Sequence, residues 1–468
     1  MDDFNEPKRD QPLVQPMKPI LIGLIDYFRE PIPAPPVTDG KKIDASYSYW
    51  RSRMLLGSLI SYALFYLTRK NLAVAMPLLS ADLHYSNSDL GILGSMLYIS
   101  YGISKGLFGF IADRADPRKL MTFGLLFSAI MNVFFSFSSS LIAFGIFWMF
   151  NGVFLATGAP ACAKICTRWF SISERGTKWS IWNISQQVGA GLVFILSGMV
   201  GTWLNWRGIF LWPGLICILG AGFIWLRLGD RPESKGLPPV DIYRNDPETA
   251  TTNESVHGET SSFFHLVVHR VLMNRNLLII ALASMFVYIV RVGTLDWMTK
   301  YLVEEKEQNL ILGSGLTSMI EFFGIPSCLL VGWISDRFFR ARRAPICVIF
   351  LLALTFAIGF VYFVPPGHPY LDGLSLALVG FFIYGPQMML AGVASADTGG
   401  SQVAAAAVGV TGVFSHLGAT ISSIGTGVIL DVSGWGGGFV FWTCCSLVAC
   451  ILLIPLWNVR GRQKQASR

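Results

Sequence analysis

The chain has 468 residues, of which 53% are hydrophobic and only 14% are charged, and its mean hydropathy is +0.52. A soluble domain of this length needs far more charge to cover its surface, so the composition excludes an ordinary soluble protein and indicates one that lies in a bilayer. The formal net charge of +7 comes from basic residues in short loops between apolar stretches. This distribution is a membrane-topology signal and argues against a nucleic-acid partner.

The chain before the first apolar span is polar, with several prolines between positions 31 and 36. We expect residues 1–52 to form a cytoplasmic N-terminal tail. Within it, the apolar stretch from Ile20 to Phe28 is too short to cross a bilayer and has the length of a segment that lies on the membrane surface. No apolar region with a small-residue cleavage site follows the basic N-terminus, so we expect the first span to remain in the mature protein.

Twelve apolar stretches follow, each long enough to cross about 30 Å of hydrocarbon. The first six cover about 53–78, 89–111, 120–138, 141–165, 179–200 and 207–227. A polar cytoplasmic linker is predicted at 228–275, and the second six spans cover about 277–301, 311–334, 344–364, 371–395, 403–428 and 437–458. The fold class predicted is therefore an all-α membrane protein of twelve transmembrane helices, with a six-helix half at 53–227, a second at 276–459 and a cytoplasmic tail at 460–468.

The orientation follows from the lysines and arginines of the short loops. The loops after spans 2 and 8 and the C-terminal tail are basic: Arg114, Arg118, Lys119, Arg337, Arg340, Arg342, Arg343, Arg460, Arg462, Lys464 and Arg468. The loops after spans 1, 3 and 9 contain no lysine or arginine. Both termini and the central linker are therefore expected in the cytoplasm, with the protein in the inner (plasma) membrane.

The two halves repeat one another. Gly-Phe-Ile-Ala-Asp-Arg at 109–114 returns as Gly-Trp-Ile-Ser-Asp-Arg at 332–337, 223 residues later, and Trp206 returns as Trp435 after 229. Two such halves related by an axis normal to the membrane describe the major facilitator fold. The two repeated loops follow spans 2 and 8, so we expect Asp113, Arg114, Asp336 and Arg337 to act in conformational gating.

The sequence contains no motif for a chemical reaction. We find no phosphate-binding G-x-x-x-x-G-K-[ST] loop and no nucleophile–base pair, and the glycines from Gly434 to Gly438 fit a turn between spans 11 and 12. Cys162 and Cys166 share a helix face, which permits a metal site, but buried packing is favoured because no further ligand accompanies them. We therefore expect neither an enzyme nor a cofactor, and a process driven by ion or solute gradients.

The informative residues are two arginines inside spans. Arg69 lies midway along span 1 and Arg291 midway along span 7, 222 residues later, so they occupy equivalent positions in the two halves. Charges inside a bilayer are costly and usually face a water-filled cavity. Two guanidinium groups that converge there suit a tetrahedral oxyanion such as phosphate. The alternative is that one arginine snorkels or pairs with an internal carboxylate, Asp296 or Glu321.

Aromatic and polar side chains accompany the arginines. Tyr62, Tyr66 and Arg69 share one helix face, as do Tyr98, Tyr101 and Lys105, and Tyr288 lies one turn before Arg291. The further candidates for a substrate cavity are Asn183 and Gln186 in span 5, Tyr384 in span 10 and His416 in span 11. For any one tyrosine, core or interfacial packing is an equally good interpretation. For His416, packing is the more common role of a lone membrane histidine.

From about Lys42 to Val459, the chain resembles the organophosphate:phosphate antiporter family, in particular its hexose-phosphate branch of transporters and transporter-like sensors. The resemblance lies in Tyr62-Ala-Leu-Phe-Tyr66-Leu-Thr-Arg69-Lys70-Asn71, Tyr101-Gly-Ile-Ser-Lys105, Arg291-Val-Gly-Thr-Leu-Asp296-Trp297, Glu321-Phe-Phe-Gly-Ile-Pro326 and Tyr384-Gly-Pro-Gln387. The stretch from Lys42 to Arg51 looks like the sensor-type members.

The resemblance implies roles for particular residues. Those matching Arg69 and Arg291 bind phosphate, Lys105 assists, and Asp296 and Glu321 belong to the charge network around the site. The chain departs from many members at Gln186, where they carry histidine, which argues against a glycerol-phosphate specificity. His416 stands where relatives often have an aromatic residue.

The function expected is exchange of a hexose phosphate, with glucose 6-phosphate first, for inorganic phosphate by alternating access. The alternative is a membrane sensor of external sugar phosphate that signals to a histidine kinase. The partners expected are accordingly an organophosphate, inorganic phosphate and membrane lipid, with a membrane histidine kinase if the protein is a sensor. Phosphoglycerate or glycerol phosphate as substrate, proton coupling and the oligomeric state stay open at this level.

Overall fold

The computed structural model describes residues 27–245, 268–340, 342–399 and 403–459. Most of the expected surface stretch from Ile20 to Phe28 lies outside these residues, as do much of the linker and the tail at 460–468. The described residues are mostly helical, with turns, irregular segments such as 30–39, and one antiparallel β-bridge between Arg29 and Ala115.

The N-terminal half consists of α2 (Gly40–Leu67), α3 (Asn71–Leu83), α4 (Asn87–Arg114), α5 (Pro117–Phe137), α6 (Leu141–Leu155), α7 (Gly158–Trp169) and α8 (Ile172–Arg227). The linker begins with η1 (Pro232–Lys235) and α9 (Val240–Arg244) and ends with η2 (Val268–Leu272). The C-terminal half consists of α12 (Arg275–Glu304), α13 (Leu310–Phe339), α14 (Arg343–Phe363), α15 (Pro369–Met388), η3 (Met389–Ala394), α16 (Ser395–Gly399), α17 (Ala404–Leu453) and η4 (Ile454–Leu456).

Eight helical segments of the described chain have the length and hydropathy of membrane spans. Two of them, within α8 and α17, are about twice the length that a bilayer needs and contain a non-helical kink, at Leu204–Asn205 and at Gly434. Each therefore supplies two crossings. With α3 joined to α2, and with α4, the arrangement is consistent with the twelve spans predicted from the sequence.

One predicted boundary agrees with the structure and one differs from it. The turn expected at the glycine cluster is confirmed, because Gly434 adopts φ 63°, a backbone conformation that favours glycine. The first helix, expected from about residue 53, instead begins at Gly40. Asp39 caps it by accepting a hydrogen bond from the backbone of Lys41 at 3.1 Å, so the polar residues before the span continue the helix.

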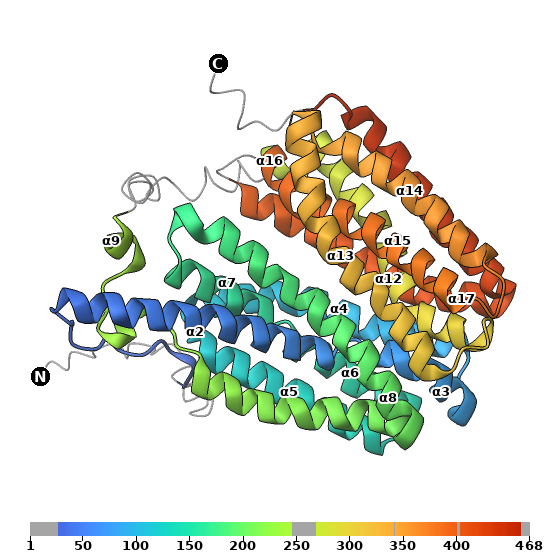
Figure 1. The fold of residues 1–468 in the computed structure, drawn as a ribbon, viewed down its shortest axis with the longest axis horizontal. Coiled ribbons are helices and arrows are strands. Elements are labelled where there is room, and N and C mark those ends of the chain that lie inside the picture. Colours follow the sequence, from blue (N-terminus) through green and yellow to red (C-terminus); the bar gives the residue numbers. More distant parts are fainter. Residues whose placement is uncertain (1–26, 246–267, 341, 400–402, 460–468) are drawn as a thin grey trace, which may run out of the picture.

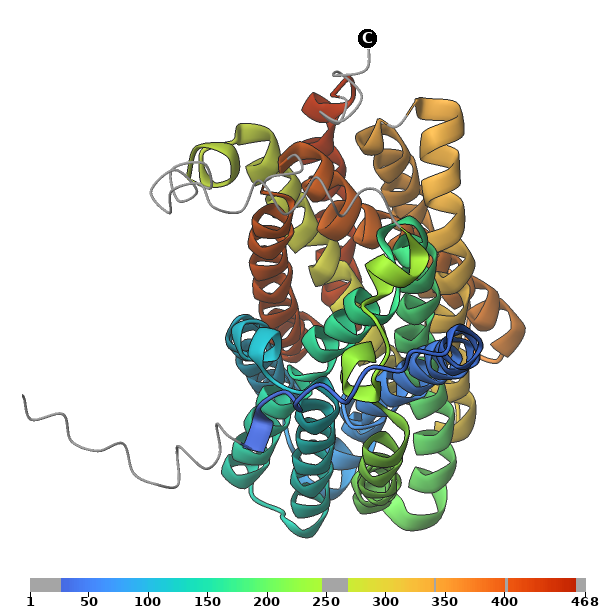
Figure 2. The same cartoon turned by 90° about the vertical axis from the view of Figure 1, so that its left-hand side faces the viewer.

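The helices form two bundles that lie side by side (Figures 1 and 2). We call the end of the bundles that bears residues 27–39, the linker and Trp457 the tail side, and the opposite end, with the kinks at Asn205 and Gly434, the far side. Contacts between the halves come mainly from α4 with α17, α8 with α13 and α3 with α12. These pairs bring the two equivalent crossings, α2–α3 and α12, into the centre of the molecule.

On the tail side, the N-terminal segment and the linker fold onto the N-terminal half. Glu30 pairs with Lys164 of α7 and with Arg231 of the linker, whose Nη1 lies 3.0 Å from Oε2. Burial alone would raise the pKa of Glu30, but the hydrogen bond and charge of Lys164 and the charge of Arg231 hold it below its usual value. Tyr47, from the added turns of α2, stacks on Tyr243 at 3.9 Å between ring centroids.

Candidate anion-binding site between the two halves

The first crossing is broken where it carries its two basic residues, Arg69 and Lys70. A break exposes backbone carbonyl groups, which are costly to bury without partners. The carbonyl oxygen of Thr68 accepts hydrogen bonds from Nδ2 of Asn151 at 2.7 Å and from Nδ2 of Asn132 at 3.5 Å. Both asparagines are fully buried. They therefore stabilise the break and with it the direction in which Arg69 and Lys70 leave the backbone.

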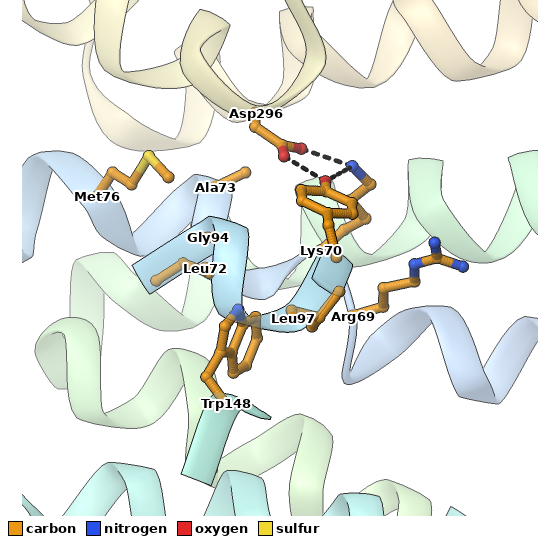
Figure 3. Close-up of a pocket in the computed structure, with 10 residues that line it drawn as sticks. Arg69, Lys70, Leu72, Ala73, Met76, Gly94, Leu97, Trp148 and Asp296 are labelled. Atoms are coloured by element: carbon orange, nitrogen blue, oxygen red, sulfur yellow. Dashed lines mark hydrogen bonds and ion pairs between the residues drawn. The ribbon is translucent and has the colours of Figure 1, made fainter. Parts of the chain in front are cut away.

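Lys70 joins the two halves through an ion pair. Its Nζ lies 2.5 Å from Oδ1 of Asp296 on α12 and 3.0 Å from the hydroxyl of Tyr98 on α4. The Tyr98 hydroxyl donates to the second oxygen of Asp296, and all three residues are buried. Figure 3 shows Lys70 pointing to Asp296 while Arg69 points away from them. The charge of Asp296 is thus matched by a lysine.

The second internal carboxylate, Glu321 on α13, is held by a tyrosine. The hydroxyl of Tyr384 on α15 donates to Oε2 of Glu321 and accepts a hydrogen bond from Nη2 of Arg291 at 3.0 Å. Glu321 therefore influences Arg291 through Tyr384. The alternative raised from the sequence, direct pairing of an arginine with Asp296 or Glu321, does not match these contacts.

Both arginines stack on tyrosine rings. The Cζ atom of Arg69 lies 4.2 Å from the ring centroid of Tyr101, and that of Arg291 lies 4.8 Å from that of Tyr384. Within the described residues, neither guanidinium group has a carboxylate at ion-pair distance, and the Nε atom of each is buried without a hydrogen-bond partner. Such donors are unfavourable unless a ligand or water accepts from them.

The two guanidinium groups share one electropositive space. Tyr66 interacts electrostatically with both Arg69 and Arg291. His416 also interacts electrostatically with both arginines, and in addition with Lys105. The ring of His416 lies 5.1 Å from that of Tyr101. Two converging forks with unused donors are a geometry for a doubly charged oxyanion.

Some of the polar residues expected around the arginines line a cavity next to them. Asn183 and Gln186 lie with Tyr288 and Tyr384 in the wall of a neighbouring cavity of about 200 Å³. The hydroxyl of Tyr66 donates to Oε1 of Gln186 at 3.0 Å and so links this cavity to the arginines.

Tyr62 and Lys105 lie next to tyrosines that stack on Arg69, and the ring centroid of Tyr62 is 5.5 Å from that of Tyr66. The ring of Tyr62 packs on Trp182, with 4.7 Å between centroids. The ammonium group of Lys105 lies 6.0 Å from the Tyr101 ring centroid, on an exposed side chain of α4.

The four expected gating residues lie on the tail side. Asp336 pairs with Arg343 of the next helix, at 2.7 Å, and Arg343 in turn bonds to Asp397 at 3.1 Å. In the other half, the backbone oxygen of Asp113 accepts from Lys164 at 3.1 Å, while Arg114 and Arg337 have exposed side chains. The repeated loops therefore hold different contacts in the two halves.

Sequence reasoning missed the roles of Lys70, Asn132 and Asn151. Lys70 carried a usable signal. It is a second cation inside span 1, and the equivalent span of the other half contains an acid, Asp296. The asparagines carried only their polarity within apolar stretches. Their common target, the carbonyl of Thr68, becomes visible only when the break in the helix is known.

The sequence is similar to known membrane transporters over nearly its whole length. A model of the Major Facilitator Superfamily matches residues 58–423. The chain is 38% identical to the probable hexose phosphate transport protein of Chlamydia pneumoniae, over 94% of this chain and 98% of that protein. It is 37% identical to the glycerol-3-phosphate transporter of Bacillus subtilis, over 92% and 98%. It is 33% identical to the membrane sensor protein UhpC of Escherichia coli, over 93% and 99%.

Solved structures show the same fold. A bacterial homologue of the human lysosomal transporter Spinster, in an inward-facing and occupied conformation, superposes with a TM-score of 0.67 at 15% identity, over 87% of this chain and 95% of that one. The xylose transporter XylE of E. coli, in a partially occluded inward-open conformation, gives a TM-score of 0.64 at 15% identity, over 86% and 98%. At this identity the likeness concerns the fold alone.

Proposed function

The chain belongs to the Major Facilitator Superfamily, in its organophosphate:phosphate antiporter branch, and on this premise we propose that it exchanges a hexose phosphate for inorganic phosphate by alternating access. It is a multi-pass membrane protein of a transporter family and not an enzyme. Glucose 6-phosphate is the substrate we expect. The proposal includes an inner-membrane location with the termini and the tail side in the cytoplasm, and halves at 53–227 and 276–459 as the moving units.

The observation that carries the proposal is the distribution of charge at the centre. The carboxylate of Asp296 is matched by Lys70, and that of Glu321 is held by Tyr384. Arg69 and Arg291 keep donors without protein partners. A phosphate dianion would accept from both forks and remove the repulsion between them, which costs most in a site with little water.

The same charge distribution favours exchange over net movement. Without an anion, bringing the halves together forces two cations into one desolvated space. A bound phosphate or phosphate ester lowers this barrier, so the site crosses loaded in both directions. In this mechanism the loops with Asp113–Arg114 and Asp336–Arg337 release and reform their contacts at each passage. On the far side the halves are in contact, because Asp431 of α17 accepts a hydrogen bond from the backbone of Asn87 in α4 at 3.0 Å. With the tail side in the cytoplasm, such a contact corresponds to an inward-facing state.

Exchange in proteoliposomes tests the proposal. Vesicles loaded with labelled phosphate should release it when glucose 6-phosphate is added outside and keep it when nothing is added. Arg69→Ala should abolish release. Arg291→Lys keeps the charge but loses the two-point fork, so apparent affinity should fall by about one to two orders of magnitude, the value of a hydrogen bond to a charged group.

Arg244→Lys is the matched control, because Arg244 lies on the tail-side surface and pairs with Glu174 at 3.5 Å. It should exchange as the unmodified protein does. Near-normal exchange in Arg69→Ala or Arg291→Lys would contradict the proposal.

A sensor of external sugar phosphate is the second candidate. It is favoured by the similarity to the sensor UhpC and by the added turns of α2, which present folded surface on the tail side. A sensor would bind the ester at the same arginines and signal to a membrane histidine kinase. Saturable binding of glucose 6-phosphate without phosphate release from any loaded vesicle would favour this function over exchange.

A further inference from the structure

The cavity beside Arg291 has the chemistry of a neutral polar site. It has a volume of about 200 Å³ and is lined by Asn183, Gln186, Tyr288, Cys328, Tyr384, Gln387, Met388, Ala391 and Gly392. No charged side chain is among these lining residues. The cavity therefore suits an uncharged, hydroxyl-rich group and not a second phosphate.

The amides of the cavity have hydrogen-bonding capacity left over. Nε2 of Gln387 donates to the hydroxyl of Tyr288 at 3.3 Å, but Oε1 of Gln387 is buried without a partner, on a residue only 8% exposed. Nε2 of Gln186 donates to Oδ1 of Asn183 at 3.2 Å. Amides both donate and accept, as hydroxyl groups do, so a ligand with several hydroxyls can pair with them. An unpaired buried acceptor such as Oε1 of Gln387 is costly until it does so.

The cavity adjoins the anion site through two shared tyrosines. Tyr384 and Tyr288 line the cavity, and the guanidinium group of Arg291 lies over both rings, at 4.8 and 5.7 Å from their centroids. A ligand whose phosphate binds Arg291 thus has its ester group next to the amides. Asn183 and Gln186 come from α8 of the N-terminal half and Gln387 from α15 of the other half, so such a ligand touches both.

The wall of the cavity is locally irregular. Directly after Gln387 and Met388, the helix widens into the π-helical turn η3 (Met389–Ala394), which supplies Ala391 and Gly392. Turns of this kind frequently occur at functional sites. A Cβ atom added at Gly392 would meet nothing within 4 Å. Small residues here therefore leave room in the cavity.

We propose that this cavity is a polyol subsite that selects a six-carbon sugar phosphate over three-carbon phosphate esters, with Gln387 and Gly392 as specificity-determining residues. The inference rests on the proposed function, because it assumes that the phosphate group binds at the arginines. A cavity of about 200 Å³ has room for several water molecules. A sugar ring displaces most of that water and pairs with the amides, whereas a glycerol group leaves much of the cavity unfilled.

Displacement of labelled phosphate from the purified full chain in nanodiscs tests the proposal, because it measures binding whether or not transport follows. Glucose 6-phosphate and glycerol 3-phosphate are the competitors. Gln387→Leu removes one neutral hydrogen-bonding group, so the ratio of their inhibition constants should move about 3- to 10-fold toward glycerol 3-phosphate. Gly392→Leu fills the cavity and should shift the ratio in the same direction by at least as much.

Two controls make the same substitutions elsewhere. Gln308→Leu lies in the loop between α12 and α13, and Gly409→Leu lies at an exposed site of α17 with open space around it. Neither should change the ratio. If Gln387→Leu and Gly392→Leu weaken both esters equally, the polyol subsite is refuted while the anion site stands. If the unmodified protein binds no phosphate at all, the proposed function itself fails.

Discussion

The side chains at the centre differ in role according to their chemistry. Compact ammonium and phenol groups hold the carboxylates, as Lys70 and Tyr98 do for Asp296, while the planar guanidinium groups stay available. A buried ion pair contributes little net stability, but removing one partner leaves an uncompensated charge. Lys70 therefore also protects the anion site, because an Asp296 carboxylate without its lysine would compete with phosphate for the nearby arginines.

The first residue-scale prediction concerns this pair, whose side chains are 6% and 8% exposed. Lys70→Gln and Asp296→Asn should each lower the melting temperature of the purified protein, in line with a cost of about 3 kcal/mol for an unpaired buried charge. The double variant should lose less stability than the sum of the losses in the two single variants. Additive losses in this cycle would show that the ion pair is not coupled as the structure indicates.

At the scale of elements, the broken crossing is held by a buried hydrogen-bond network from two neighbouring helices. Ser128 Oγ donates to Oδ1 of Asn151 at 2.6 Å, and Nδ2 of Asn71 donates to Oδ1 of Asn132 at 2.8 Å. The same asparagines donate to Thr68. The equivalent crossing of the other half, α12, is a continuous helix of 30 residues. The pseudo-symmetry of the sequence therefore does not extend to the local backbone around the two arginines.

Asn151→Ala should accordingly weaken phosphate binding although Asn151 does not reach the anion. Losing the donor to Thr68 leaves a buried carbonyl unpaired, a cost of about 1–3 kcal/mol, and lets Arg69 leave its position. Calorimetric phosphate titration checks the affinity, and thermal melting checks the fold separately. Asn458→Ala, on an exposed residue that bonds to Arg342, is the control. Lower melting temperature with unchanged affinity would make the network merely structural.

At the scale of the whole molecule, the two halves meet closely on the far side. Asp431 of α17 accepts hydrogen bonds from the backbone of Asn87 and Ser88 at the start of α4, at 3.0 and 2.7 Å. Glycines make this approach possible. A Cβ atom at Gly427 would lie 2.3 Å from the oxygen of Asn87, and one at Gly91 would lie 2.5 Å from that of Ser423. Backbone atoms at these distances cannot give way like a flexible side chain.

Gly427→Val should therefore prevent far-side closure, abolish exchange and leave phosphate binding from the far side intact. Spin labels on Asp82→Cys and Ser433→Cys would report this as a longer distance between α3 and α17. Gly222→Val, where an added Cβ meets nothing within 4 Å, is the matched control and should exchange normally. An unchanged label distance in Gly427→Val would refute this account of closure.

Much of this architecture was predictable from the sequence. Hydropathy determined the membrane location, since no other arrangement satisfies so many apolar stretches and their backbone groups. The repeat at Asp113 and Asp336 indicated two related halves, and the equivalent positions of Arg69 and Arg291 indicated an anion site. These inferences depend on composition, spacing and internal repetition, all of which a linear sequence contains.

Only the tertiary structure decided which charges pair and which stay available. Lys70 and Asp296 are 226 residues apart, and Asn151 meets Thr68 across 83. The helix break that orients Arg69 is stabilised by side chains of other helices. Residues 68–70 contain no proline or glycine that would reveal the break in the sequence. Local sequence describes the preferences of each segment. The partners of a buried polar group depend on which helices pack together, and here that packing separates the arginines from the carboxylates.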